Sequence, residues 1–422
     1  MKLLDRIRLL FERYDRRLWV LFVVQLVVTL GFGAAMPFVS LYLYQERGIP
    51  MTLVGTMMLC AAVASAVGRI LGGELADRIG RKPLVVGAMV LQTGFFLAMA
   101  WTIARHAPIL GIASAFLAVR FAGSAAEPGI SAMVADVVLP ERRIEAFGFL
   151  RIGGNTGWAI GPAVGGFLLT VSYDSLFLLT AAATLVGAFL VLFLTRESIA
   201  AREQEPFSLV RLLDAGRDRR FLGFTVWSLF LFLLVGQFAT TLTVFSTGAL
   251  GASDVALGFL FTLNGLICVF FQWPASAAAK RLGMRSSLVL SSLLYALGYF
   301  SVGLVPAAGY LYLSMTVLTF GEILFSPTAN AMVANLAPSG KTGRYLGFYG
   351  LAEGFGRSAG PFFGGLLLDR LLGRPVVLWG ALAGFGVIAA VGFFFLARRI
   401  EVHSAGAISR RRRAVPAGRG GP

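Results

Sequence analysis

Long apolar runs, broken by short polar stretches, follow one another along almost the whole chain. A helix needs about 20 mostly apolar residues to cross the hydrocarbon core of a membrane. Backbone groups in lipid must be paired within their own segment, so each such run is predicted to be a helix. The pattern predicts an all-α membrane protein with twelve transmembrane helices, at 18–44, 52–76, 83–104, 109–137, 143–170, 174–195, 221–248, 254–279, 286–305, 309–336, 344–369 and 375–397.

The composition indicates an integral membrane protein. Hydrophobic residues make up 57% and charged residues 14% of the chain, whereas soluble domains carry about 25% charged residues. The two cysteines, Cys60 and Cys268, lie inside apolar runs and are interpreted as small buried side chains. His106 and His403 are far apart, so no histidine-based metal site or catalytic triad is indicated. We therefore expect no cofactor and no metal.

The positive charge is distributed unevenly between alternate connections. Of the 37 Lys and Arg residues, 29 fall in the segments that share a side with the N-terminus. Only Arg47, Arg105, Arg370 and Arg374 fall on the other side. Because Lys and Arg concentrate in cytoplasmic loops, both termini are predicted to be cytoplasmic, in a plasma (inner) membrane. The same asymmetry accounts for the net charge of +16 without a nucleic-acid partner.

The chain contains an internal sequence repeat. The sequence PGISAMVAD at 128–136 returns as PTANAMVAN at 327–335, and GPAVGG at 161–166 returns as GPFFGG at 360–365, both after 199 residues. LADRIG at 75–80 has a fainter echo, AAKRLG at 278–283, after 203 residues. Two parallel six-helix halves imply a pseudo-two-fold axis along the membrane normal, with a site between them.

The repeat also sets the expected domain boundaries. A six-helix bundle is predicted over 1–195 and a second over 221–398, joined by a cytoplasmic linker at 196–220. The basic segment 399–422, with its arginine run at 410–413, is expected to be a disordered cytoplasmic tail.

Three motifs carry a resemblance to a known family. The charged stretch GGELADRIGRKP at 72–83 resembles the loop signature of the major facilitator superfamily. GWAIGPAVGG at 157–166 and GFGAAMP at 31–37 are similar to motifs of its drug:proton antiporters, and Arg120 matches its motif arginine. The Gln-Gly that follows this arginine in the family pattern is replaced here by Gly123-Ser124. The resemblance implies twelve helices in two pseudo-symmetric bundles that alternate in access.

The resemblance also implies a cytoplasmic gate. In such a gate Asp77 would meet the N-terminus of the eleventh span, and Arg81 would reach Asp136, so that the outward-open state is stabilised. The alternative is that the basic residues only set topology. The gate residues are Gly73, Asp77, Arg78, Gly80, Arg81, Lys82 and Asp136.

Small residues in the fifth span form a second motif to which the resemblance assigns a role. Glycines four apart make a smooth helix face that allows close packing. In the family this face is thought to block a leak to the outside, whereas ordinary helix packing is the simpler interpretation. The residues are Gly157, Gly161, Pro162, Gly165 and Gly166.

Ionisable residues within the spans are the candidates for proton coupling, because such groups are costly in a membrane. A coupling carboxylate needs a pKa raised toward neutrality by burial. Glu322 ranks first, Glu127 second and Glu353 third. The alternative for each is a structural hydrogen bond or ion pair, as for Glu353 with Arg357 four residues later. Candidates for the substrate cavity are Arg120, Gln25, Gln237, Arg151, Asn155 and Asn264. For Gln25, Gln237 and Asn264 the alternative is a hydrogen bond that bridges two helices.

These features together predict a secondary active transporter that exports small lipophilic or cationic compounds in exchange for protons. The alternative is a proton-coupled or facilitative transporter of a metabolite such as a sugar or amino acid. No Gly-rich phosphate loop occurs, which argues against ATP as the driving force. A membrane enzyme or sensor is disfavoured because no nucleophile–base or metal constellation is found. The expected partners are the lipid bilayer, a small-molecule substrate and protons, and the chain is expected to be a monomer.

Overall fold

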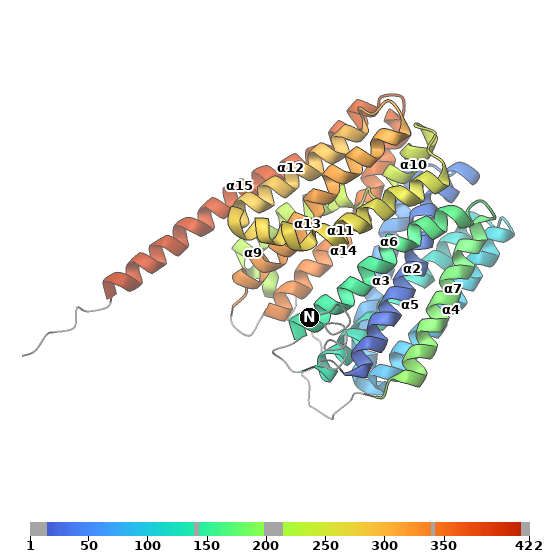
Figure 1. The fold of residues 1–422 in the computed structure, drawn as a ribbon, viewed down its shortest axis with the longest axis horizontal. Coiled ribbons are helices and arrows are strands. Elements are labelled where there is room, and N and C mark those ends of the chain that lie inside the picture. Colours follow the sequence, from blue (N-terminus) through green and yellow to red (C-terminus); the bar gives the residue numbers. More distant parts are fainter. Residues whose placement is uncertain (1–14, 139–142, 198–213, 339–341, 415–422) are drawn as a thin grey trace, which may run out of the picture.

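The computed structural model describes residues 15–138, 143–197, 214–338 and 342–414, without the side chains of 77, 143–145, 342–343 and 397–414. Thirteen α-helices lie within these ranges (Figure 1). The first half contains α2 (Arg16–Leu41, continued by a π-helical turn at Tyr42–Glu46), α3 (Met51–Ile79), α4 (Arg81–Ala104), α5 (Ile109–Val137), α6 (Arg143–Leu168) and α7 (Tyr173–Leu194).

The second half contains α9 (Arg219–Val235), α10 (Thr241–Gly248), α11 (Asp254–Leu282), α12 (Met284–Val302), α13 (Leu311–Leu336), α14 (Thr342–Leu371) and α15 (Pro375–Ala414). Short 3-10 turns lie at Asp214–Arg217 and Ala308–Tyr310. The helices α9 and α10 together form one crossing, so the predicted twelve crossings are confirmed.

Eight of the described crossings are long and apolar enough to span a membrane by composition alone. The other four are α6, α9, α12 and α14, which pack beside them in the same bundles (Figure 1). The helices α6 and α14 contain many glycines and several charges, α12 contains five serines, and α9 is shortened by the turn before α10. The helix α9 has only 17 residues, and several serines of α12 are buried against other helices.

Polar side chains fix the first turn of several helices. Asp15 accepts a hydrogen bond from the amide of Arg17 at 2.8 Å before α2. Asp218 accepts from the amides of Arg220 and Phe221 before α9, and Ser253 accepts from Ala256 before α11. These caps satisfy amides that have no partner inside the helix. The capping residues therefore mark where the spans begin.

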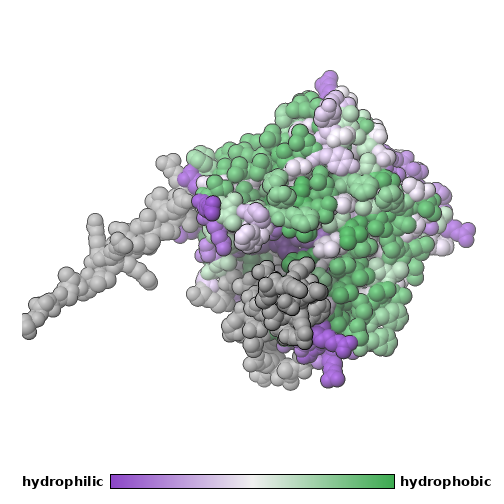
Figure 2. All heavy atoms as spheres, viewed as in Figure 1, coloured by the Kyte–Doolittle hydropathy of each residue, from purple (hydrophilic) through white to green (hydrophobic). Residues whose placement is uncertain are grey.

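The surface of the two bundles is largely apolar. Hydrophobic residues cover the outer sides of the helices in Figure 2, and hydrophilic residues gather toward helix ends. Exposed side chains such as Trp273, Leu110 and Phe193 would be unfavourable in water. The distribution is that of a protein whose sides face lipid.

Two seams join the halves. In one, α6 packs against α11, and in the other, α14 packs against α3. A Cβ at Gly166 would lie 2.5 Å from the carbonyl oxygen of Asp254, and one at Gly365 would clash with that of Met51. The glycines differ by 199 residues and their partners by 203, as in the sequence repeat. The internal repeat is therefore present in the packing.

The halves are hydrogen-bonded at one end of the bundle. We call the end where α2 and α9 begin the linker face, and the other end the opposite face. At the opposite face Asp369 accepts from the backbone amides of Met51 and Thr52 at 2.9 and 2.8 Å. Gln45 donates to Thr247 across the same face at 2.8 Å. This conformation is therefore closed at the opposite face.

The end of the chain differs from the expectation. The segment 399–422 was predicted to be disordered, but α15 continues as a helix to Ala414 and projects from the bundle (Figure 1). No proline interrupts the sequence between Pro375 and Pro416, so a helix that starts in the membrane has no strong breaker beyond it. Residues 415–422 lie outside the described part.

Candidate functional site

The turn between α3 and α4 lies at the linker face and contains the charged motif. Gly80 has φ of +101°, a conformation that residues with a Cβ rarely adopt. The carboxylate of Glu197, just beyond α7, accepts from the amides of Arg81 and Lys82 at 3.3 and 3.1 Å. The ammonium of Lys82 donates to the carbonyl of Thr195 at 2.9 Å. The turn is thus tied to the start of the linker, a role for Glu197 that the sequence did not indicate.

Arg81 forms the expected contact with Asp136 at the end of α5. The two side chains are an ion pair, and only 8% of Arg81 and 22% of Asp136 are exposed. Arg78, by contrast, is exposed and pairs with Glu74 on its own helix. The side chain of Asp77 is outside the described part, so its contact with the eleventh span stays a prediction.

The glycine motif of α6 has two packing faces. Gly157, Gly161 and Gly165 lie against the backbone of α2, where an added Cβ would meet Leu26, Leu30 and Ala34. Gly166 and the carbonyl of Pro162 face α11 of the other half instead. The motif therefore joins α6 to its own bundle on one side and to the opposite bundle on the other.

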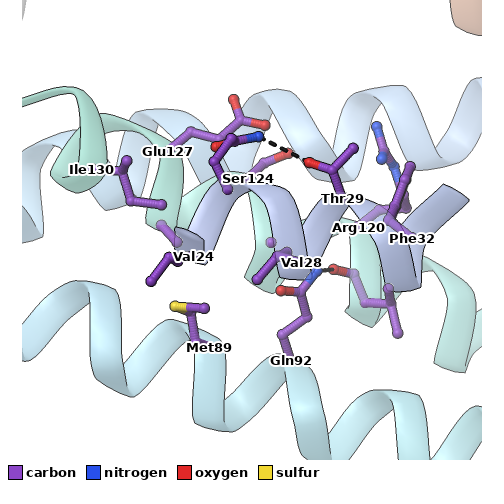
Figure 3. Close-up of a pocket in the computed structure, with 14 residues that line it drawn as sticks. Val24, Val28, Thr29, Phe32, Met89, Gln92, Arg120, Ser124, Glu127 and Ile130 are labelled. Atoms are coloured by element: carbon purple, nitrogen blue, oxygen red, sulfur yellow. Dashed lines mark hydrogen bonds between the residues drawn. The ribbon is translucent and has the colours of Figure 1, made fainter. Parts of the chain in front are cut away.

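A cavity of about 200 Å³ lies inside the first half, between α2, α4 and α5 (Figure 3). Arg120 and Glu127 both line it, together with Gln25, which donates to Thr29 at 3.0 Å. The guanidinium of Arg120 lies 5.5 Å from the centre of the Phe32 ring, within the range of a cation–π interaction. The cavity combines one cation and one carboxylate with an apolar wall.

Glu127 forms an ion pair with Arg69 and not with Arg120. The guanidinium of Arg69 on α3 lies 2.5 Å from the Glu127 carboxylate. Both residues also line a second cavity of about 350 Å³, which reaches Gly73 on α3 and Gly347 on α14 near the linker face. No pattern in the sequence indicates this role for Arg69.

The departure from the family pattern after Arg120 has a structural counterpart. A Cβ at Gly123 would clash with the carboxamide of Gln92 on α4. Gln92 is buried and donates to the carbonyl of Val119 at 3.4 Å. A glutamine amide therefore occupies this region from α4 instead of from α5. A single sequence gave no signal for this exchange.

The second half holds a compact group of charged side chains. Asn264 on α11 donates to Glu322 at 2.9 Å and to Thr319 at 3.0 Å, both on α13. Glu353 and Arg357 form an ion pair at 3.1 Å along α14. Both acids line a cavity of about 70 Å³. All three carboxylates proposed from the sequence thus border cavities.

Arg151 reaches into this group from the first half. Its guanidinium donates to the hydroxyl of Ser326 at 2.7 Å, one turn after Glu322 on α13. Arg151 also lines the same small cavity as Glu322 and Glu353. The sequence placed Arg151 on a cavity face but gave no indication of a contact between halves.

A central cavity of about 240 Å³ lies between the two halves. Arg120 borders it from α5 and Arg357 from α14. The turn between α9 and α10 contributes Phe238 and Thr240. The other walls include Phe32, Met36, Met58, Phe116 and Trp158. A site between the halves was expected from the repeat, and the structure contains a cavity there.

Three of the predicted cavity residues, Gln237, Asn155 and Asn264, border none of the cavities described above. Gln237 is fully buried, donates to the carbonyls of Leu233 and Gly360 at 2.8 Å, and accepts from Thr241. It secures the break between α9 and α10 and does not line the central cavity. Asn155 is partly buried on α6 and lines neither the central cavity nor the one around Glu322.

Tyr295 and Tyr349 were not selected from the sequence, yet both line the cavity around Glu322. Tyrosines on apolar helices are common packing residues, so their identity alone gave no functional signal. Ser326 was equally unselected, although the 199-residue repeat places it opposite Glu127. The repeat could have identified this position.

Sequence comparison matches the chain to one family. The family model described as the Major Facilitator Superfamily covers residues 21–361 and, in a second match, 238–418. The multidrug resistance protein MdtH of Yersinia enterocolitica is 29% identical over 386 residues, which are 89% of this chain and 94% of that protein. The uncharacterized MFS-type transporter YttB of Bacillus subtilis is 28% identical over 381 residues, covering 86% and 91%.

Solved structures share the fold. A POT family transporter in complex with a thioalcohol-conjugated peptide superimposes with a TM-score of 0.75 over 91% of this chain and 96% of that chain. The nucleoside transporter NupG gives 0.74 over 90% and 98%. Both are only 16% identical to this chain, so the likeness concerns the fold alone.

Proposed function

We propose that this chain, which belongs to the major facilitator superfamily, exports small lipophilic compounds in exchange for protons. It is a multi-pass membrane transporter and not an enzyme. In the proposal the linker face is cytoplasmic, the membrane is the plasma (inner) membrane, and one chain is sufficient for transport. Relatives named as multidrug resistance proteins, at 28–29% identity, support export of several compounds.

The observation that carries the proposal is a closed opposite face combined with cavities that begin at the linker face. Asp369 and Gln45 bridge the halves at the opposite face. The 350 Å³ cavity between α3, α5 and α14 begins near the linker face, and the central cavity lies farther in. A site open to one side at a time is what alternating access requires.

Glu322 is proposed as the proton-carrying group because the other two candidates form ion pairs with arginines. Glu127 pairs with Arg69 and Glu353 pairs with Arg357. Within the described residues Glu322 has no cation within 4.0 Å, and Asn264 donates to one of its oxygens. An amide donor can remain in contact with a carboxyl group in either protonation state, since the carbonyl-type oxygen still accepts.

Arg81 and Asp136 are proposed as the gate at the linker face. Their ion pair orders the turn before α4 and the end of α5 within the first half. In the outward-open state this rigid corner, with Asp77, would meet the N-terminus of α14, where the helix dipole favours a carboxylate. The gate would then stabilise the outward-open state, which differs from the conformation described here.

The test is transport into proteoliposomes with and without an imposed pH gradient, for a panel of lipophilic dyes. Glu322→Gln is expected to abolish the response to the gradient while dye binding to purified protein is retained. Glu127→Gln is the matched control on the pseudo-equivalent helix and should keep at least part of the response. A normal gradient response in Glu322→Gln would refute the assignment and transfer the role to Glu127.

The metabolite-transporter alternative is tested by the same vesicles. Sugars and amino acids are added to the panel in competition with the dyes. Competition by one metabolite, with no flux of any dye, would replace the export proposal.

A further inference from the structure

We infer that the central cavity recognises small amphiphilic anions, in particular aromatic compounds with one carboxylate or sulfonate, and that Arg120 binds the anionic group. The inference rests on the proposed function, because it names the chemical class of compound carried through the same cavity. The sequence analysis expected lipophilic or cationic compounds, and the inference departs from the cationic ones.

Among the described residues that line the cavities, positive and negative side chains are not equal in number. Arg69 is neutralised by Glu127, and Arg357 by Glu353. Arg151 shares the small cavity of the second half with Glu322 and Glu353, so that group contains two cations and two anions once Arg357 is counted. Arg120 is the cation that remains.

Arg120 has no acidic partner in the described part of the chain. No carboxylate oxygen lies within 4.0 Å of its guanidinium, and its recorded contact is the face of the Phe32 ring at 5.5 Å. A charged residue well inside a span is unfavourable unless it is paired or hydrated. A bound anion would supply the missing charge and the hydrogen-bond acceptors that a guanidinium fork matches.

Glu127 does not supply this charge. It lies seven residues after Arg120 on α5, about 10 Å along the helix axis, and its carboxylate contacts Arg69 at 2.5 Å. Among the side chains that border the central cavity, the charged ones are Arg120 and Arg357, and both are cationic. Since Arg357 is already paired with Glu353, a cationic compound would meet the positive charge of Arg120 here, and no carboxylate is among the described residues that border this cavity.

The rest of the cavity suits an aromatic body. Its wall includes Phe32, Phe116, Trp158 and Phe238, with Met36 and Met58 between them. Aromatic and methionine side chains make adaptable contacts with flat apolar groups. The volume of about 240 Å³ is below the range of about 300–1,000 Å³ for drug-sized ligands. A compound with one or two rings is therefore the expected size.

The test is calorimetric binding to the full chain in lipid nanodiscs at pH 7, with three compounds that share one ring system. Indole-3-acetate is an anion, indole-3-acetamide is neutral and tryptamine is a cation. The expected order of affinity is acetate, then amide, then tryptamine, with the acetate at least tenfold tighter than the amide.

Three variants locate the effect. Arg120→Gln is expected to remove the tenfold advantage of the acetate and to leave amide binding within about twofold. Arg120→Lys keeps the charge and should retain part of the advantage. Arg285→Gln is the matched control, because Arg285 also lies over a phenylalanine ring, Phe394 at 4.3 Å, but outside the cavities. It should leave all three affinities unchanged.

The inference is overturned if tryptamine binds as tightly as the acetate, if the acetate does not bind, or if Arg120→Gln keeps the preference. Amide binding that stays within about twofold shows that Arg120→Gln is folded, and a partial preference for the acetate in Arg120→Lys shows that the positive charge at this position carries the effect. These measurements need no gradient. Preferential acetate binding without proton-driven flux would refute proton-coupled export and leave the anion site standing.

Discussion

The two halves of the chain share one backbone plan but carry different charges on it. Arg81 and Asp136 form a largely buried ion pair at the linker face of the first half. After 203 and 199 residues their counterparts are Met284 and Asn335, whose amide nitrogen lies 3.7 Å from the methionine sulfur. Both halves thus have a side-chain contact at this position, but only the first half has an ion pair there. A gate at the linker face would need only one such ion pair, whereas packing in each half would need a contact at this position.

The cavity positions differ in the same way. Arg120 in the first half corresponds to Thr319 in the second, and Glu322 in the second corresponds to Gly123 in the first. Among the described residues, the first half supplies a cation with no acidic partner, Arg120, and the second supplies a carboxylate with no arginine within 4.0 Å, Glu322. Such a division would let substrate binding and proton binding occupy different bundles of one rocking structure.

The largest expected effect is the loss of the ion pair. Arg81→Gln removes the arginine from a largely buried ion pair and should cost about 3 kcal/mol of stability, since a broken buried pair is strongly destabilising. Thermal unfolding in detergent measures the loss. Asn335→Ala, at the counterpart position, should cost less than about 0.5 kcal/mol because its contact is weak and exposed. Equal losses in the two variants would contradict the asymmetry.

A smaller effect is expected at the two turn glycines. Gly80 and Gly283 have φ of +101° and +81° and precede α4 and α12 at equivalent positions. Replacement by Ala should cost about 2 kcal/mol at each, because this region is nearly restricted to glycine. Gly80→Ala should be the more harmful, since its Cβ would also lie 2.9 Å from the Glu197 carboxylate. Unfolding midpoints of the two variants give the comparison directly.

The smallest effect is expected at the seams. Gly166→Ala and Gly365→Ala place a Cβ against backbone of the other half, so each should disfavour closure of the opposite face. A tenfold shift in the population of closed molecules, about 1.4 kcal/mol, is expected for both. Distances between spin labels on the two halves report the shift. Gly384→Ala is the control, because nothing lies within 4 Å of its added Cβ.

Unequal shifts in the two seam variants would show that the seams differ in strength despite their equivalent geometry. Equal shifts, together with unequal losses at Arg81 and Asn335, would place the functional asymmetry in the side chains alone.

Much of the candidate site followed from the sequence because ionisable residues are rare in its spans. Glu322, Glu127 and Arg120 stood out for that reason, and each borders a cavity. Gln237 was only an uncharged polar candidate, and it is a packing residue, since polarity alone does not say which way a side chain points. Gln92 lies beside Gly123 because α4 packs against α5, and no local sequence pattern connects these two residues.

The sequence by itself determined the twelve crossings, the two repeated halves and the side on which the positive charge lies. These follow from hydropathy, periodicity and composition, which are properties of short segments. Only the tertiary structure decided that Glu127 pairs with Arg69, that Arg151 crosses between the halves to Ser326, and that Arg120 has no acidic partner among the described residues. Charge pairing depends on distances of a few ångströms between different helices, and segments far apart in the chain acquire such distances only when the bundles pack.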